Sequence, residues 1–156
     1  MPNLNPGLSS FMRLSPVIPV LVIDRTEDAV PLGRALVDGG LKVLEITLRT
    51  PNALDVIREI ANHVEGAVVA AGTVTTPAQW EAAAEAGAQF MVSPGLTPAL
   101  IEHAQQAATG LLPGVATASE LMIALDGGFT NFKFFPAQQA GGTGMLKALG
   151  GPFADA

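Results

Sequence analysis

Short apolar runs, several of them rich in β-branched residues, alternate along the chain with segments that suit helices. The runs begin near residues 17, 43, 67, 89, 111 and 131, and their sequences are VIPVLVI, VLEITL, AVVAAG, QFMVS, LLPGV and NFKFF. The helical segments that follow them are Glu27–Asp38, Pro51–His63, Pro77–Ala86, Pro98–Ala107, Ser119–Leu125 and Met145–Leu149. A strand followed by a helix, repeated along the whole chain, predicts right-handed βαβ crossovers on a parallel sheet, and hence an α/β fold.

The spacing of these runs distinguishes two α/β architectures. Their starts lie roughly 20 to 26 residues apart, close to the smallest repeat that holds a strand, a helix and two loops. This spacing favours a compact (β/α)8 TIM barrel, of which the chain encodes about six βα units, with the C-terminal two missing. The alternative is a six-stranded doubly wound sheet, which fits the length but lacks a GxGxxG motif after the first run and a Walker A loop. We predict that residues 15–156 form one incomplete barrel domain and that residues 1–14 form an N-terminal lead.

Threonines predict where four of the helices begin. Thr26, Thr50, Thr76 and Thr97 stand where N-cap residues are expected, and proline follows the last three at the first helical position. These positions support the division of the chain into regular strand and helix units.

The composition is rich in apolar residues and poor in charge. Hydrophobic residues make up 49% of the chain and charged residues only 14%, against roughly 25% charged in an average soluble domain. Such a chain can bury a sizeable core, which excludes intrinsic disorder. Its 8 Lys and Arg residues against 14 Asp and Glu residues provide no basic surface for phosphate backbones, so we expect no nucleic-acid partner.

The absence of cysteine excludes disulfides, thiolate nucleophiles and zinc–thiolate sites. It is compatible with the reducing cytoplasm, where we expect the protein to act. Residues 1–15 lack the features of a signal peptide, and no long apolar run predicts a membrane span. His63 and His103 fall late in predicted helices without a companion ligand, so we expect surface positions and no metal site.

Polar side chains gather where the predicted strands end, the face at which barrels of this kind hold their active sites. In the run that starts at Val43, the residues Glu45, Thr47 and Arg49 share one parity, and the residues between them are apolar. Because side chains alternate along a strand, one side of this strand should be polar and the other packed on helices.

Lys133 is the most informative single residue. It lies within a β-run of phenylalanines, where folding removes much of its hydration, and desolvation favours the neutral amine. A neutral amine on a rigid strand is what Schiff-base chemistry with a carbonyl substrate requires. The alternative interpretation is an inward lysine that merely pairs with Glu45 across the barrel, and the lysine alone does not decide between the two.

Four other polar positions each have a chemical and a structural interpretation. Glu45 could act as a general acid and base beside the amine, or serve as the counter-ion of Lys133 or Arg49. Arg49 could hold a carboxylate or phosphate, or form a salt bridge at the rim. Thr73 and Thr117 could bind a substrate oxygen or cap the following helix, and capping is the commoner role of a lone threonine.

Five ordered motifs carry a family resemblance. The segments VLEITLRT, VVAAGTV, GAQFMVSPGLT, LLPGVATASEL and FKFFPA resemble the 2-keto-3-deoxy-6-phosphogluconate (KDPG) aldolases, a class I group that also includes 4-hydroxy-2-oxoglutarate (KHG) aldolase. The resemblance runs from about Ser15 to Phe153. It implies a (β/α)8 barrel, assembled as a homotrimer, that needs no cofactor or metal. The implied reaction is the reversible cleavage of KDPG, a small keto acid, to pyruvate and glyceraldehyde 3-phosphate, a lyase step of the Entner-Doudoroff pathway.

The resemblance also implies roles for residues within these motifs. Lys133 of FKFFPA corresponds to the Schiff-base lysine, and Glu45 of LEITLRT corresponds to the carboxylate that transfers protons. Arg49 in the same motif corresponds to a residue that binds the carboxylate derived from pyruvate. Thr73 of AGTV and Pro94 of SPGLT correspond to residues that line the pyruvyl pocket.

Family members continue beyond the GPF segment into a seventh strand with a PTGG motif and an eighth with a GS-rich loop. These loops form the phosphate site, and neither motif occurs in this sequence. We therefore expect the pyruvyl half of the site, with weak discrimination for the substrate phosphate. The alternatives to a KDPG aldolase are a KHG or related 2-keto acid aldolase, a non-catalytic truncated barrel fragment that pairs its edges with other copies, and a keto-acid binding module.

Overall fold

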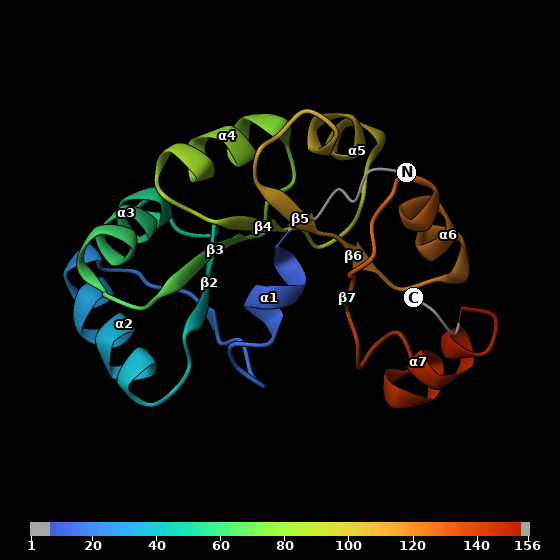
Figure 1. The fold of residues 1–156 in the computed structure, drawn as a ribbon, viewed down its shortest axis with the longest axis horizontal. Helices are drawn as coiled ribbons and strands as arrows, with labels where there is room; N and C mark the ends of the chain where they lie inside the picture. Colours follow the sequence, from blue (N-terminus) through green and yellow to red (C-terminus); the bar gives the residue numbers. More distant parts are fainter. Residues whose placement is uncertain (1–6, 154–156) are drawn as a thin grey trace.

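The computed structural model describes residues 7–153, and Figure 1 shows their arrangement. The helices are α1 (Leu8–Met12), the 3-10 helix η1 (Thr26–Asp28), α2 (Ala29–Asp38), α3 (Ala53–His63), α4 (Pro77–Glu85), α5 (Pro98–Ala104), α6 (Ala118–Asp126) and α7 (Gly142–Gly150). The strands are β1 (Val20–Leu21), β2 (Val43–Thr47), β3 (Val68–Gly72), β4 (Phe90–Val92), β5 (Gly110–Leu112), β6 (Gly114–Val115) and β7 (Lys133–Phe134). Every predicted run overlaps a strand and every predicted segment overlaps a helix, which confirms the α/β class. Within this part of the chain, no helix is long and apolar enough to cross a membrane.

All the strand pairs are parallel, and the strands lie in the order of the sequence. One sheet has the order β1-β2-β3-β4-β5, and β6 pairs with β7 in a second sheet. The fifth run is divided between the sheets because Pro113, which has no backbone N–H, separates β5 from β6. The backbone N–H of Lys133 donates to the Pro113 carbonyl at 2.9 Å, so β7 continues the sheet beside the second half of that run.

The strands have a helix-covered outer face and an inner face. In Figure 1, helices α2 to α6 follow one another in an arc outside the strands. The outer cluster packs Leu44 and Ile46 of β2 against helix residues such as Ile57. The inner cluster is built from apolar strand residues together with one residue of α1: Val43, Val68, Ala70, Phe90, Val92, Leu112 and Leu8.

Helix α1 packs on the inner face. Leu8 is fully buried there, and the ring of Phe11 stacks on that of Phe90 with centroids 5.7 Å apart. Phe90 is the first residue of β4, so α1 lies toward the amino ends of the strands. Residues 8–12 of the predicted lead thus form a helix packed on the core, while residues 1–6 lie outside the described part of the chain.

Strand β2 divides its side chains as predicted. Leu44 and Ile46 belong to the outer cluster, whereas Val43 belongs to the inner cluster. Glu45 and Thr47 share the parity of Val43 and are only 5% and 2% exposed. The alternation therefore carries a carboxylate and a hydroxyl into the inner face.

Two of the four predicted N-caps are confirmed. The hydroxyls of Thr76 and Thr97 accept hydrogen bonds from the backbone N–H three residues later, and proline follows each of them. The predictions for Thr26 and Thr50 are wrong. Thr26 lies inside η1, and the Thr50 hydroxyl donates to a backbone carbonyl just beyond β1, so α3 begins after Asn52 instead.

Helix α6 begins with a capping box, which gives Thr117 the capping role. The Thr117 hydroxyl accepts from the Glu120 N–H at 3.2 Å, and the Glu120 carboxylate accepts from the N–H groups of Ala116 at 2.8 Å and Thr117 at 2.9 Å. The bond from Ala116 is the largest cause that holds the pKa of Glu120 below its ordinary value of 4.5.

We expect Glu120→Gln to lower the Tm by about 1–3 °C at neutral pH and to have no effect in strong acid. Because folding lowers the pKa of Glu120, the carboxylate stabilises the fold above its unfolded-state pKa, and this contribution disappears as the pH falls through the folded-state pKa. Thermal unfolding followed by circular dichroism across this acidic range measures the difference. Glu65→Gln, at an exposed position outside the helices, is the control. A Tm of Glu120→Gln that stays below that of the original chain at the lowest pH would contradict the expectation.

Candidate active site

An ion pair joins Lys133 of β7 to Glu45 of β2 across the inner face. The Lys133 Nζ atom lies 3.1 Å from Oε1 and 3.4 Å from Oε2 of Glu45. The glutamate side chain is 6% exposed and the lysine side chain 26% exposed. Nζ also lies 5.5 Å from the ring centroid of Phe135. A proton can pass directly between the amine and the carboxylate, and the contact fits both the structural and the catalytic interpretation of Lys133.

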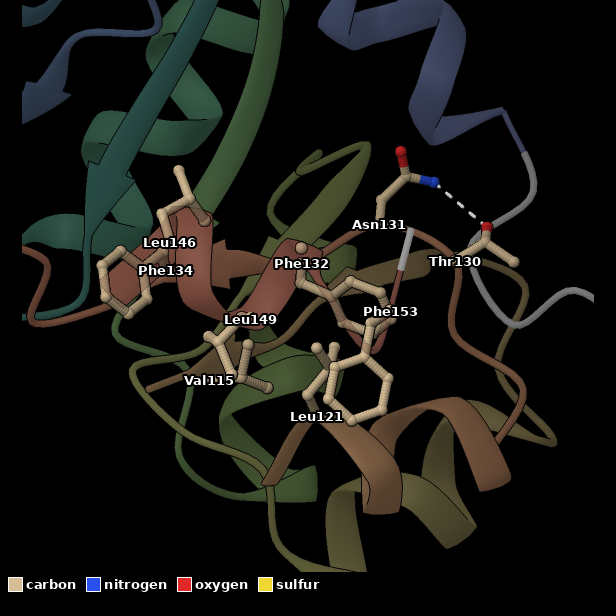
Figure 2. Close-up of a pocket in the computed structure, with 10 residues that line it drawn as sticks. Val115, Leu121, Thr130, Asn131, Phe132, Phe134, Leu146, Leu149 and Phe153 are labelled. Atoms are coloured by element: carbon tan, nitrogen blue, oxygen red, sulfur yellow. Dashed lines mark hydrogen bonds between the residues drawn. The ribbon is translucent and has the colours of Figure 1, made fainter. Parts of the chain in front are cut away.

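Alternation along β7 accounts for the inward direction of Lys133. Phe132 and Phe134 flank the lysine and line a pocket beside α6 and α7, as Figure 2 shows. Neither Lys133 nor Glu45 lines this pocket, so the lysine faces the side of β7 opposite to the two phenylalanines. The pocket has a volume of about 460 Å³ and is lined by Val115, Leu121, Thr130, Asn131, Phe132, Phe134, Leu146, Leu149, Gly150 and Phe153.

The absence of a side chain at Gly72 makes room for the Glu45 carboxylate. Gly72 ends β3 and pairs in register with Thr47, two residues beyond Glu45. A Cβ atom at Gly72 would lie 2.8 Å from Cγ and 3.0 Å from Cδ of Glu45 and would overlap Oε1. The glutamate side chain therefore lies directly against the Gly72 backbone, and its present direction depends on this space.

Pro94 lies where the chain beyond β4 meets β6. A Cβ atom at Gly114 would overlap the Pro94 carbonyl group and lie 2.8 Å from the carbonyl oxygen of Ser93. Gly114 in turn pairs in register with Lys133. The close backbone approach at Gly114 therefore brings the Ser93–Pro94 turn next to the strand pair that holds the lysine.

Arg49 lies two residues beyond β2 and is tied to that strand through Thr47. The Arg49 Nε–H donates to Thr47 Oγ1 at 3.2 Å, and Thr47 Oγ1 donates to the carbonyl of Leu21 in β1 at 3.0 Å. Arg49 is exposed as a whole. Its other N–H groups can therefore take a carboxylate or phosphate from solution.

Thr73 directly follows β3 in a left-handed backbone conformation, with φ of 63°. Among residues 7–153 it is the one non-glycine residue with a positive φ. A β-branched residue held there stores about 1–3 kcal/mol of strain, and such positions cluster at functional sites. Thr76 caps α4, so Thr73 does not have the capping role.

All five predicted site residues lie in, or shortly after, parallel strands. Lys133 and Glu45 are in direct contact. Arg49, Thr73 and Pro94 follow the carboxyl ends of β2, β3 and β4. Within the described part of the chain, no hydrogen bond joins these three residues to the Lys133–Glu45 pair.

Thr47 and Gly72 also shape the site, and the sequence prediction did not assign either of them a role. The parity of Thr47 with Glu45 and Arg49 was a signal that could have pointed to it. Gly72 gave a weaker signal, because a glycine at the end of a strand can mark either a turn or a close approach. Only the register of β2 against β3 shows which role Gly72 has.

Both histidines lie in helices, and each contacts a glutamate. His63 is 54% exposed, as expected, and its Nδ1 lies 3.2 Å from Oε2 of Glu59. His103 is only 20% exposed because its ring packs edge-on against Trp80, and its Nε2 lies 2.7 Å from Oε1 of Glu81. In residues 7–153, no group of three or more His, Cys, Asp or Glu side chains is placed to hold a metal ion.

The sequence matches a known family over almost its whole length. Residues 8–156 match the model of the family described as “Aldolase: KDPG and KHG aldolase”. The chain is 49% identical over 153 residues to the KHG/KDPG aldolase of Escherichia coli strain K12. The aligned region covers 98% of this chain and 72% of the relative.

Two solved structures are similar in fold as well as in sequence. The KDPG aldolase of Zymomonas mobilis with 3-phosphoglycerate has a TM-score of 0.92 and 51% identity, covering 96% of this chain and 71% of that one. The KDPG aldolase of Legionella pneumophila, with pyruvate captured at low pH as a covalent carbinolamine intermediate, has a TM-score of 0.91 and 48% identity. This match covers 94% of the present chain and 71% of that one.

Proposed function

Because this chain belongs to the KDPG and KHG aldolase family, we propose that it is a class I aldolase that cleaves KDPG to pyruvate and glyceraldehyde 3-phosphate. The observation that carries the proposal is the 3.1 Å contact between Lys133 Nζ and the buried carboxylate of Glu45. The carbinolamine captured in the Legionella relative supports covalent chemistry of this type.

In this proposal Lys133 is the nucleophile. Once Nζ has given a proton to Glu45, the amine attacks the C2 carbonyl carbon of the substrate, and loss of water from the carbinolamine gives an iminium ion. The Glu45 carboxylate then takes the proton of the C4 hydroxyl, the C3–C4 bond breaks to release the aldehyde, and the bonding electron pair forms an enamine. The Glu45 carboxyl group gives this proton to C3 of the enamine, and hydrolysis of the resulting iminium ion releases pyruvate and regenerates the amine. The iminium nitrogen is the electron sink, so the reaction needs no cofactor.

Glu45 moves protons beside that amine. At 3.1 Å it can take a proton from Nζ and return it to the carbinolamine hydroxyl, which then leaves as water. The space at Gly72 keeps the carboxylate in this position. General acid–base catalysis of this kind contributes about 100- to 10,000-fold to a rate.

The other predicted residues bind the pyruvyl end of the substrate. Arg49 takes the carboxylate through the N–H groups on Nη1 and Nη2, and Thr73 and Pro94 line the pocket. Their positions beyond the carboxyl ends of β2, β3 and β4 support this assignment.

We also propose that residues 15–156 hold about six βα units of a (β/α)8 barrel domain and that residues 1–14 lead into it. The neighbouring parallel strands in sequence order support this architecture, as does the coverage of 72% of the E. coli relative. By family resemblance the enzyme is a cytoplasmic homotrimer.

A second candidate activity is KHG aldolase, because the name of the E. coli relative covers both substrates. KDPG and 4-hydroxy-2-oxoglutarate deliver the same pyruvyl group to Lys133 and differ only at the aldehyde end. Comparison of kcat/KM for the two substrates separates the candidates.

Incubation with pyruvate and sodium borohydride tests the proposed chemistry. Borohydride reduces the pyruvyl iminium to a stable secondary amine, so we expect one reduced pyruvyl group on the chain. We expect peptide mapping to place this group on Lys133. The absence of an adduct on the folded chain would contradict the proposal. In that case, a pyruvate-dependent rise in Tm without a mass shift would indicate a binding module.

A further inference from the structure

Thr47 places a buried hydroxyl between strand β1 and Arg49. It is the last residue of β2 and is 2% exposed. Its Oγ1 donates to the Leu21 carbonyl at 3.0 Å and accepts from the Arg49 Nε–H at 3.2 Å. A hydroxyl has one proton to donate, so Oγ1 presents only lone pairs to the guanidinium once that proton is given to Leu21.

This arrangement fixes one edge of the Arg49 guanidinium. A guanidinium carries five N–H donors, and Thr47 occupies the one on Nε. The donors on Nη1 and Nη2 form a parallel pair that matches the two oxygens of a carboxylate. Because a long exposed side chain must lose rotational freedom to bind a ligand, a partner that orders it beforehand strengthens binding.

We propose that Thr47 is a positioning residue that holds Arg49 Nε and thereby sets the Nη1–Nη2 edge to take the carboxylate of the 2-keto acid. The inference rests on the proposed function, because that function assigns the substrate carboxylate to Arg49. The Leu21 carbonyl that accepts from Thr47 is held in the sheet, since Leu21 pairs with Ile46 in the β1–β2 register. The hydroxyl thus connects the sheet backbone to the recognition of the substrate's charge.

Replacement of Thr47 by valine tests this role, because valine keeps the shape of threonine and removes the oxygen. The readout is borohydride trapping on Lys133, with pyruvate and with acetone, a neutral ketone that lacks the carboxylate. We expect Thr47→Val to raise the pyruvate concentration for half-maximal trapping about tenfold and to leave that for acetone unchanged. Thr47→Ser, which keeps the hydroxyl, should remain within about threefold of the original chain. An equal loss with both ketones would show a merely structural role and overturn the proposal.

A double-mutant cycle with Arg49→Ala tests the route through the arginine. If Thr47 acts by way of Arg49, adding Thr47→Val to Arg49→Ala should change the half-maximal pyruvate concentration by less than about twofold. A further tenfold loss in that background would overturn the assignment.

The pyruvate-dependent rise in Tm, measured without borohydride, separates this inference from the proposed chemistry. If the original chain forms no adduct, but pyruvate raises its Tm and no longer does so in Thr47→Val, the positioning role stands and the Schiff-base mechanism is overturned. If the original chain forms the adduct and Thr47→Val traps pyruvate equally well, the mechanism stands and the positioning role is overturned.

Discussion

Replacing Lys133 by methionine should abolish the trapped pyruvate adduct and lower kcat/KM for KDPG about 1,000-fold or more. Methionine keeps an apolar stem beside Phe135 and removes the amine that attacks the carbonyl. Without this amine no iminium forms, so no electron sink exists for cleavage of the C3–C4 bond. Mass spectrometry after reduction measures the adduct, and a coupled assay of pyruvate release measures turnover.

Stability must be followed in the same variant, because Glu45 is left buried without its cation. We expect a lower Tm for Lys133→Met, and we expect the double variant Lys133→Met/Glu45→Gln to recover much of it without recovering the adduct. Lys147→Met is the matched control, since Lys147 is exposed on α7 and should leave trapping and turnover unchanged. An adduct on folded Lys133→Met would show that a different amine is the nucleophile.

The meeting of Lys133 and Glu45, which are 88 residues apart in the chain, could largely be predicted from the sequence. Alternation along the strand predicted that Glu45 lies on the side opposite its apolar neighbours. The apolar residues on both sides of Lys133 indicated the same for the lysine. Parallel strands carry their carboxyl ends to one edge, so two short-range patterns were enough to place both groups on one face.

Other features depended on contacts that no local pattern contains. The Thr50 hydroxyl donates to the Ile23 carbonyl just beyond β1, so it does not cap α3, which begins after Asn52 instead. The helix at residues 8–12 is held by contacts such as the stacking of Phe11 on Phe90, which lies far along the sequence. The space at Gly72 has a function only because β3 pairs with β2 in one particular register.

The Gly72→Ala variant should lower kcat for KDPG about 100-fold or more, because the new methyl group takes the space of the Glu45 carboxylate. The added Cβ would lie 2.8 Å from Cγ and 3.0 Å from Cδ of Glu45, so the side chain must turn away and lose its 3.1 Å contact with Lys133. Strand β3 cannot easily retreat, since it is paired with β2 on one side and β4 on the other. Overpacking of this kind costs about 1–3 kcal/mol of stability. Single-turnover trapping with pyruvate should slow but still reach completion, because the amine remains.

The Glu45→Ala background shows whether Gly72 acts through the glutamate. With the glutamate side chain removed, the methyl group of Gly72→Ala meets no carboxylate, so the second substitution should cost little further activity or stability. Gly150→Ala is the matched control, because a Cβ atom there meets open space. If Gly72→Ala lowered kcat by the same factor in both backgrounds, its effect would come through the β3 backbone. The space at Gly72 would then not be what directs Glu45 toward Lys133.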